Sequence, residues 1–330
     1  MNMRWIRVLA VGCGLLTGCG TSDAGDGMSG ESEDGTTGAT GMPATDAGTT
    51  MPASGSGMDP DDTGMDTGSV PTTTGTPPDD DTSTGGGEGV CQPPPARMVV
   101  LGDSIAACFG VGGVDSSDCA PRLVADYLDQ NVGPVVYQNL SVSGAVTTDV
   151  SQSQIFNVEV GMPGHVFVMI YIGGNDLAQY IFLSDQAALD GWNNTTGPVV
   201  AQAWEEILDF FGDEANFPDG VTLMMNTQYN PFDDCTAAPY FVSETKIMLL
   251  HQHNDALTER ANSRQWAFIA DQHPSYLGHG HYVNDSGCPH YDASFDGWMN
   301  DLIHPNAAGH THLADVMIET AQQQVYSCEE

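Results

Sequence analysis

A serine, a histidine and an aspartate in this chain could act together in nucleophilic catalysis. Ser104 follows an apolar run in the string MVVLGDS, and Asp301 lies three residues before His304 in DLIHP. A serine hydroxyl is a poor nucleophile until a base takes its proton, and histidine can do this near neutral pH. A carboxylate must hold the imidazole in the right tautomer. Asp301 is close enough in sequence to bond Nδ1 of His304 from the same loop, and Pro305 keeps His304 out of helical geometry.

The string around Ser104 does not decide its role by itself. Gly-Asp-Ser is also ordinary turn chemistry, and the Gly-x-Ser-x-Gly pattern of a nucleophile elbow fails because position 106 is alanine. Ser104 could cap a helix, and Asp301 and His304 could be a surface pair. Residues elsewhere in the chain have to distinguish these alternatives.

Two more apolar runs end in residues suited to chemistry. Gly144 lies in NLSVSGAV and Asn175 lies in GGND. A glycine lets a backbone N–H approach a substrate because it has no Cβ, and an asparagine offers an amide donor. Each could equally be a turn or a helix cap. We interpret the neighbouring carboxylates Asp103 and Asp176 as structural groups that bond backbone around the site.

The elements that would position these residues alternate along the chain. Five apolar runs have the character of buried parallel strands: 97–102, 135–142, 166–173, 221–228 and 265–271. Helical patterns lie between and after them, at 120–131, 198–215, 243–263 and 306–326. Such alternation predicts an α/β fold with a parallel sheet covered on both faces. Ligands bind such sheets at the carboxyl ends of the strands, where the candidate residues would meet.

The Gly-Asp-Ser, Gly-x-Asn-Asp and Asp-x-x-His motifs, in this order, resemble those of the GDSL or SGNH hydrolase superfamily. The resemblance covers residues 97–326 and implies a flavodoxin-like three-layer α/β/α sandwich with a five-stranded parallel sheet. It implies a nucleophilic Ser104 completed by Asp301 and His304. It also implies an oxyanion hole made by the backbone N–H groups of Ser104 and Gly144 and the side chain of Asn175. The expected reaction is ester hydrolysis through an acyl-enzyme, with no cofactor and no metal.

The substrate class stays open at this point. Acyl or acetyl esters of lipids or glycans are the candidates. The insertion after Asn175, residues 176–197, could contact an apolar substrate or could simply pack in loops. The same two alternatives hold for the side chain of Trp298. The alternative function is a catalytically inactive surface module that binds glycan or lipid, but no motif is broken here. We expect a monomer.

Six cysteines follow residue 90, and an even number in an exported chain indicates disulfides. They are Cys91, Cys108, Cys119, Cys235, Cys288 and Cys328. Many pairings are possible; we predict Cys108–Cys119, Cys235–Cys288 and Cys91–Cys328. No Cys-x-x-Cys pair is present, which argues against a cysteine metal site.

Residues 1–18 have the character of a signal peptide, with Arg4 and Arg7 before a short apolar run. The string Leu16-Thr17-Gly18-Cys19 resembles the lipobox of bacterial lipoproteins. This resemblance implies cleavage before Cys19 and lipidation of Cys19. It also implies anchoring in the bacterial envelope, at the outer membrane or cell surface. An ordinary secretory signal and an uncleaved anchor are the alternatives.

Residues 19–90 are rich in Gly, Thr, Ser, Pro and Asp, and this composition predicts a disordered acidic tether. From residue 20 onward this segment has fourteen acidic residues, no Lys or Arg, and no apolar periodicity, so it cannot bury enough surface to fold. Residues 91–330 form the expected catalytic domain. The formal net charge of −37 excludes nucleic acid as a partner. The expected partners are an ester substrate and, through the anchor, a membrane.

A histidine-rich segment, residues 273–290, raises the question of a metal. It contains His273, His279, His281 and His290, with Asp271 and Asp285 nearby. Their spacing matches no familiar metal site. We therefore expect this segment to form a wall of the active-site cleft and to hold no metal.

Overall fold

The computed structural model describes residues 91–236 and 242–327. Within these residues all five strands lie in one parallel sheet, in the order β2-β1-β3-β4-β5. The strands are β1 (Arg97–Gly102), β2 (Val136–Asn139), β3 (Val166–Tyr171), β4 (Val221–Asn226) and β5 (Ala267–Ala270). This is the flavodoxin-like order. The predicted α/β/α sandwich is therefore confirmed, and each strand lies inside one of the predicted apolar runs.

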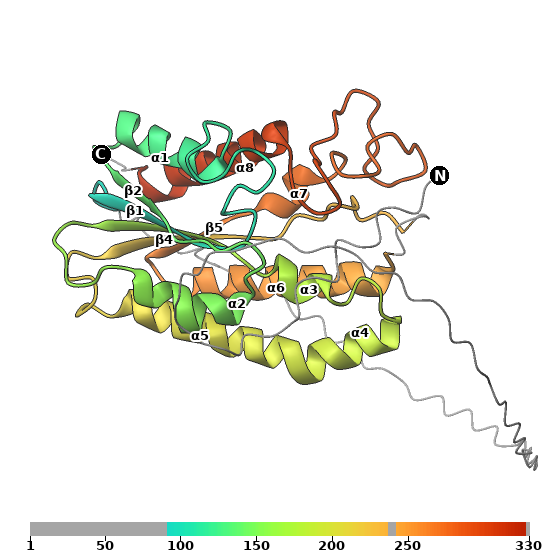
Figure 1. The fold of residues 1–330 in the computed structure, drawn as a ribbon, viewed down its shortest axis with the longest axis horizontal. Helices are drawn as coiled ribbons and strands as arrows, with labels where there is room; N and C mark the ends of the chain where they lie inside the picture. Colours follow the sequence, from blue (N-terminus) through green and yellow to red (C-terminus); the bar gives the residue numbers. More distant parts are fainter. Residues whose placement is uncertain (1–90, 237–241, 328–330) are drawn as a thin grey trace, which may run out of the picture. The chain divides into compact units, whose positions relative to one another are not determined.

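Helices cover both faces of the sheet (Figure 1). The helices α1 (Ala120–Asn131) and α8 (Ala307–Thr320) lie over one face, and α5 (Gly197–Gly212) and α6 (Glu244–Asn262) lie over the other. Successive strand residues point to opposite faces, so β1 supplies a core on each side. Met98 and Val100 pack with α1 and α8, whereas Val99 and Leu101 pack with α5.

Several short elements were not predicted, and most follow the carboxyl ends of strands. They are α2 (Thr147–Asp149), α3 (Gly174–Ala178), α4 (Asp185–Gly191) and α7 (Gln272–Tyr276). A 3₁₀ turn spans Ile155–Asn157, and π-helical turns span Val150–Gln154 and Trp192–Thr196. A further π-helical turn, Ala321–Val325, continues α8 within the predicted helix 306–326. The isolated ones among them are too short to show helical periodicity in the sequence. By contrast, α4 and Trp192–Thr196 run directly into α5 and extend the predicted helix at its N-terminal end.

Two of the predicted disulfides are present. Cys108 is bonded to Cys119 and Cys235 to Cys288, with Cα–Cα distances of 5.3 and 5.4 Å. The predicted pair of Cys91 and Cys328 includes a residue outside the described part of the chain. The signal peptide, Cys19 and the tether also lie outside it.

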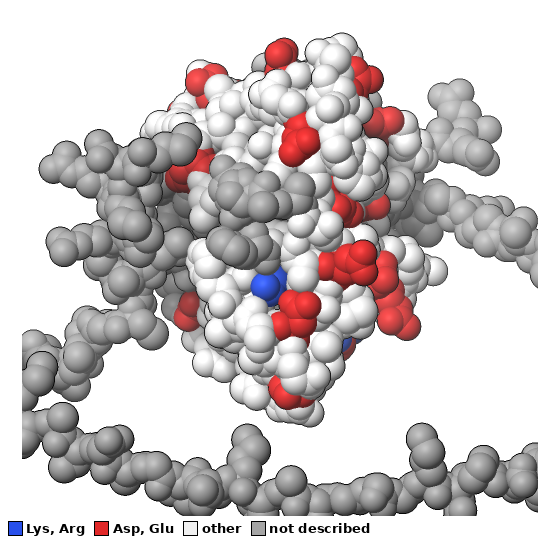
Figure 2. Space-filling model, turned by 90° about the vertical axis from the view of Figure 1, so that its right-hand side faces the viewer, with Lys and Arg blue, Asp and Glu red and all other residues white. Residues whose placement is uncertain are grey.

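The surface carries the acidity of the sequence. On the face shown in Figure 2, acidic side chains are spread over the surface and basic ones are few. Among residues 91–236 and 242–327, no helix combines the length and apolar character that crossing a bilayer requires.

Candidate active site

Ser104 lies in the turn that leaves β1. Gly102, at the end of the strand, has φ +138°, and a Cβ there would lie 2.0 Å from the carbonyl oxygen of Tyr171. Only glycine fits this close approach. Asp103 then accepts a hydrogen bond from the backbone N–H of Ile105 at 2.9 Å. These constraints hold Ser104 at the carboxyl end of the sheet, with 7% of its surface exposed.

His304 connects Ser104 to Asp301 across 200 residues of sequence. Nε2 of His304 lies 2.9 Å from Oγ of Ser104, and Nδ1 lies 2.8 Å from Oδ2 and 2.9 Å from Oδ1 of Asp301. A carboxylate can only accept, so Nδ1 carries the proton. Nε2 of the neutral ring is then the acceptor, and the hydroxyl of Ser104 donates to it. This is the arrangement in which an imidazole can take a proton from serine.

A tight turn holds Asp301 against the ring. Oδ1 of Asp301 accepts the backbone N–H groups of Ile303 at 3.0 Å and His304 at 2.9 Å. Partial burial tends to raise the pKa of Asp301, but these hydrogen bonds and the contact with His304 outweigh it and lower that pKa. The backbone N–H of Asn300 also donates to the carbonyl of His304 at 2.8 Å. The carboxylate is therefore ionised at neutral pH and fixed in direction.

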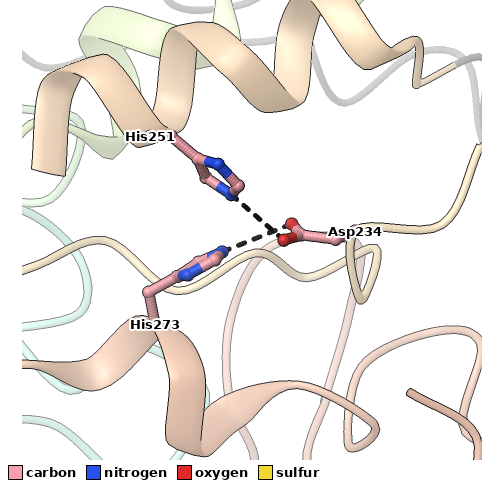
Figure 3. A group of neighbouring side chains, drawn as sticks. All are labelled: Asp234, His251 and His273. Carbon is pink, nitrogen blue, oxygen red and sulfur yellow. Dashed lines mark hydrogen bonds and ion pairs between the residues drawn. The ribbon is translucent and has the colours of Figure 1, made fainter. Parts of the chain in front are cut away.

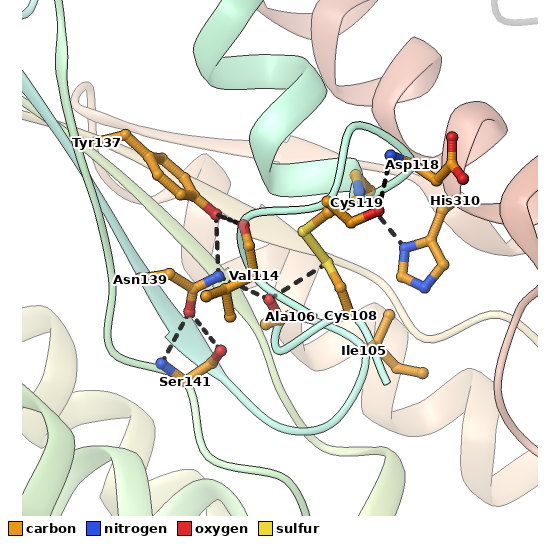
Figure 4. The surroundings of a disulfide bond; sticks show 12 residues. Ile105, Ala106, Cys108, Val114, Asp118, Cys119, Tyr137, Asn139, Ser141 and His310 are labelled. Carbon is orange, nitrogen blue, oxygen red and sulfur yellow. Dashed lines mark hydrogen bonds between the residues drawn. A yellow bond between two sulfur atoms is a disulfide. The ribbon is translucent and has the colours of Figure 1, made fainter. Parts of the chain in front are cut away.

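The loop after Ser104 brings an aromatic ring to the same site, and a disulfide closes this loop (Figure 4). The bond between Cys108 and Cys119 closes this loop, and Asn139 on β2 donates to the carbonyl of Ala106 at 2.9 Å. The ring of Phe109 lies 4.5 Å from the ring of His304, centroid to centroid. Phe109 was not identified from the sequence, where no periodic pattern marks it.

Asn175 and Gly144 lie on neighbouring segments. Asn175 is the second residue of α3, and its Nδ2 donates to the carbonyl of Ala145 at 2.9 Å. Gly144 precedes that carbonyl residue, has φ +86° and would meet nothing within 4 Å if it carried a Cβ. Asn175 also lines the same pocket as Ser104. The structure thus brings the Gly144 loop to the amide of Asn175, and this amide to the Ser104 pocket.

The two carboxylates interpreted as structural do bond backbone. Oδ2 of Asp176 accepts both the N–H and the hydroxyl of Thr147, each at 2.9 Å, which joins α3 to α2. Asp103 is 2% exposed, and burial raises its pKa to about 7 despite the hydrogen bond from Ile105, with a further contribution from the charge of Asp176. Neither carboxylate is hydrogen-bonded to His304 among the contacts of the described residues.

An apolar pocket opens beside Ser104. About 870 Å³ of empty space lies within it, part of it open solvent. Most of its lining is aliphatic or aromatic and includes Leu177, Ile181, Phe232, Ile247 and Leu250. The insertion after Asn175 therefore does reach the pocket. Trp298 does not line the pocket. Its ring stacks on those of His279 and His312, with centroid distances of 3.4 and 4.3 Å.

The histidine-rich segment does not gather its own histidines, and it supplies none of the pocket lining. His279 lies against Trp298, and His281 donates from Nε2 to the carbonyl of Leu302 at 3.0 Å. His290 is exposed. The expectation that this segment lines the cleft is therefore wrong for this pocket. His273 instead contacts Asp234, a residue that sequence reasoning did not single out.

This chain is similar to one family model and to several solved structures. A family model described as GDSL-like lipase/acylhydrolase matches residues 98–317, from β1 into α8. Among solved structures, the chain is similar to an extracellular lipase from Streptomyces rimosus, at 20% identity and a TM-score of 0.48 over 68% of this chain and 99% of that one. It is also similar to an acetylxylan esterase from Geobacillus stearothermophilus, at 16% identity and a TM-score of 0.49 over 72% and 98%. No curated protein sequence matches.

Proposed function

The chain belongs to the GDSL-like lipase/acylhydrolase family, and from this premise we propose that it hydrolyses carboxylic esters through an acyl-enzyme on Ser104. Family membership supports ester hydrolysis as the reaction. The observation that carries the proposed mechanism is the continuous hydrogen-bonded chain from Oγ of Ser104 through His304 to Asp301.

In the proposed reaction, Oγ of Ser104 attacks the ester carbonyl while Nε2 of His304 takes its proton. Asp301 stabilises the imidazolium through Nδ1. Collapse of the tetrahedral intermediate breaks the bond to the alcohol, which leaves with the proton from Nε2. Water then attacks the acyl-enzyme with the same base, which releases the acid and restores Ser104.

The oxyanion of this intermediate needs hydrogen-bond donors. We assign the backbone N–H groups of Ser104 and Gly144 and the side chain of Asn175. The open space around Gly144 leaves room for a substrate oxygen. An asparagine amide has two N–H bonds, and Ala145 takes only one from Asn175. The other is available to the substrate.

The pocket beside Ser104 supports an apolar acyl chain as the group transferred. Its lining residues Leu177, Ile181 and Phe232 would remove such a chain from water, at roughly 25 cal/mol per Å² of apolar surface buried. A bare acetyl group would leave most of this lining uncovered. We therefore favour acyl esters longer than acetate over acetylated glycans.

The test is a panel of p-nitrophenyl esters from acetate to decanoate, with Ser104→Ala as the blank. We expect turnover that disappears in the blank, and kcat/KM that rises with chain length. If the folded wild type shows neither a burst nor turnover on any ester, the proposed esterase activity is contradicted. That result would favour the alternative, a catalytically inactive module that binds glycan or lipid. A maximum at acetate would contradict only the acyl-pocket assignment.

A matched pair of variants tests the pocket itself. Ile181→Trp would fill part of it, so kcat/KM should fall at least about tenfold for decanoate and little for acetate. Phe182→Trp is the control, because Phe182 is 66% exposed and lies outside the pocket lining. Equal losses on both esters, or the same loss in the control, would contradict the assignment.

We also propose that Cys19 carries lipid and anchors the domain in the bacterial envelope. The order of small residues before Cys19 supports this. Cys19→Ser should move the protein from membrane to soluble fractions and abolish uptake of labelled palmitate. A variant that still sediments with membranes and still takes up label would refute the anchor.

A further inference from the structure

Two histidines and an aspartate, none of them hydrogen-bonded to Ser104 or His304 among the described contacts, converge on one point (Figure 3). Asp234 lies in the loop after β4, His251 on α6 and His273 on α7. Nε2 of His251 lies 3.1 Å from Oδ2 of Asp234, and Nε2 of His273 lies 3.3 Å from Oδ1. One ligand atom from each residue lies within 4.8 Å of the others. All three groups are types that bind transition metals.

These separations suit a tetrahedral ion. Zinc bonds nitrogen and oxygen at about 2.1 Å, so neighbouring ligand atoms around it lie about 3.4 Å apart. The two nitrogen–oxygen separations are close to that value, but one is to Oδ2 and the other to Oδ1 of Asp234, so one imidazole must shift for both nitrogens to share an ion with a single oxygen. The side chain of His251 is 46% exposed, so it has room to adjust and leaves a route for an ion from solvent. Two imidazoles and one carboxylate leave one tetrahedral position for water.

A neighbouring side chain orients the carboxylate of Asp234. Nδ2 of Asn230 donates to Oδ1 at 2.6 Å, which orients the carboxylate as outer hydrogen bonds do at metal sites.

The backbone beneath the cluster is unusually constrained. Asp233 and Asp234 both have positive φ, at 53° and 51°, a conformation that costs energy in residues other than glycine. The carboxylate of Asp233 accepts the N–H groups of Gly278, Gly280 and Tyr282 at 2.7 to 3.0 Å. These bonds fix the turn so that Asp234 faces the two histidines.

From this geometry we infer that Asp234, His251 and His273 bind a divalent transition metal ion, with zinc the best fit. In the metal-free protein, imidazole N–H groups can donate to the carboxylate, and a bound ion takes the place of these protons. The ion joins the loop after β4 to α6 and α7. It lies beside the disulfide at Cys235 and close in sequence to Phe232, which lines the Ser104 pocket. The site is therefore a structural brace for one pocket wall.

The first experiment titrates zinc into the metal-free, tag-free full chain by calorimetry. We expect about one equivalent to bind with micromolar or tighter affinity, and magnesium, which prefers all-oxygen ligands, not to compete. At a hundredfold excess over Kd, zinc should raise Tm by about 5 to 10 °C. The absence of saturable zinc binding below millimolar concentrations would overturn the inference and leave a purely hydrogen-bonded cluster.

A matched pair of variants locates the ion. His251→Gln keeps an amide that can donate to Asp234 but removes the imidazole ligand, so zinc affinity should fall about a hundredfold or more. His290→Gln, at an exposed histidine outside the cluster, should bind zinc like the wild type. Equal affinities in both variants would refute the site. Independently of any variant's folding, anomalous scattering from zinc-loaded wild-type crystals must place the ion between the three side chains; an ion elsewhere refutes the assignment.

Discussion

Replacing Asp301 with asparagine should prevent His304 from acting as a base without disturbing the turn that holds residue 301. Oδ1 of Asp301 accepts the backbone N–H groups of Ile303 and His304. An asparagine keeps its carbonyl oxygen at that position, because the amide nitrogen cannot accept. Its NH₂ group must then occupy the place of Oδ2, 2.8 Å from Nδ1 of His304. Nδ1 of His304 also lies 2.9 Å from Oδ1, but the two lone pairs of an amide oxygen there are already taken by the two backbone N–H groups. The amide N–H at the Oδ2 position therefore favours Nδ1 as the acceptor, with the proton on Nε2.

A proton on Nε2 prevents His304 from accepting the proton of Ser104. The same wrong-tautomer change in a serine protease triad costs about 10⁴ in kcat, or about 5 to 6 kcal/mol. We expect Asp301→Asn to lose a similar factor, with KM little changed. The assay is steady-state hydrolysis of a p-nitrophenyl ester, and thermal unfolding checks that Tm stays within a few degrees of the wild type.

Asp296→Asn is the control, because its side chain is exposed in the same loop and its charge change is identical. It should keep kcat within about twofold. If Asp301→Asn retains kcat within tenfold while folded, Asp301 does not set the tautomer of His304. If the two variants lose activity equally, the effect is one of net charge, and the reasoning from the amide orientation is wrong.

Three further outcomes follow from the same geometry. Ser104→Ala and His304→Ala should each remove nearly all turnover, and the double variant should be no worse than either in single-turnover assays, because the two residues act in one step. Asn175→Ala should lower kcat about 10² to 10³-fold with little change in KM; it should also lower the free energy of unfolding by about 1 kcal/mol, because the buried carbonyl of Ala145 loses its donor. Burial raises the pKa of Asp103 to about 7 in the folded state, against about 3.9 when unfolded. The folded state therefore binds more protons in this window, and this group's contribution to stability falls as pH rises from about 4 to 7. Asp103→Asn should remove a loss of about 3 kcal/mol between pH 5 and pH 8, because about two pH units of that interval lie below the folded pKa of about 7. Urea unfolding of both proteins at the two pH values measures this loss, and parallel pH profiles would contradict it.

The sequence by itself determined the layered fold. Buried parallel strands need apolar residues on both faces, so runs such as that of β1 are visible without any tertiary information. The long helices α1 and α6 are likewise marked by helical spacing and, for α6, by a serine cap at Ser243. The candidate site residues were visible for a related reason: parallel strands end at one edge, so the residues after them must meet there.

Only the tertiary structure decided which side chains touch. Asn175 spans to the carbonyl of Ala145, a contact that no sequence pattern marks and that gives its removal a structural cost. The Ser104 pocket draws its lining from α3, the loop after β4 and α6, and Asp234 meets histidines from two different helices. Periodicity and motifs report the order of residues along one segment. The pairing of side chains from distant segments depends on crossover geometry, loop conformation and side-chain packing, which are fixed only when the whole chain folds.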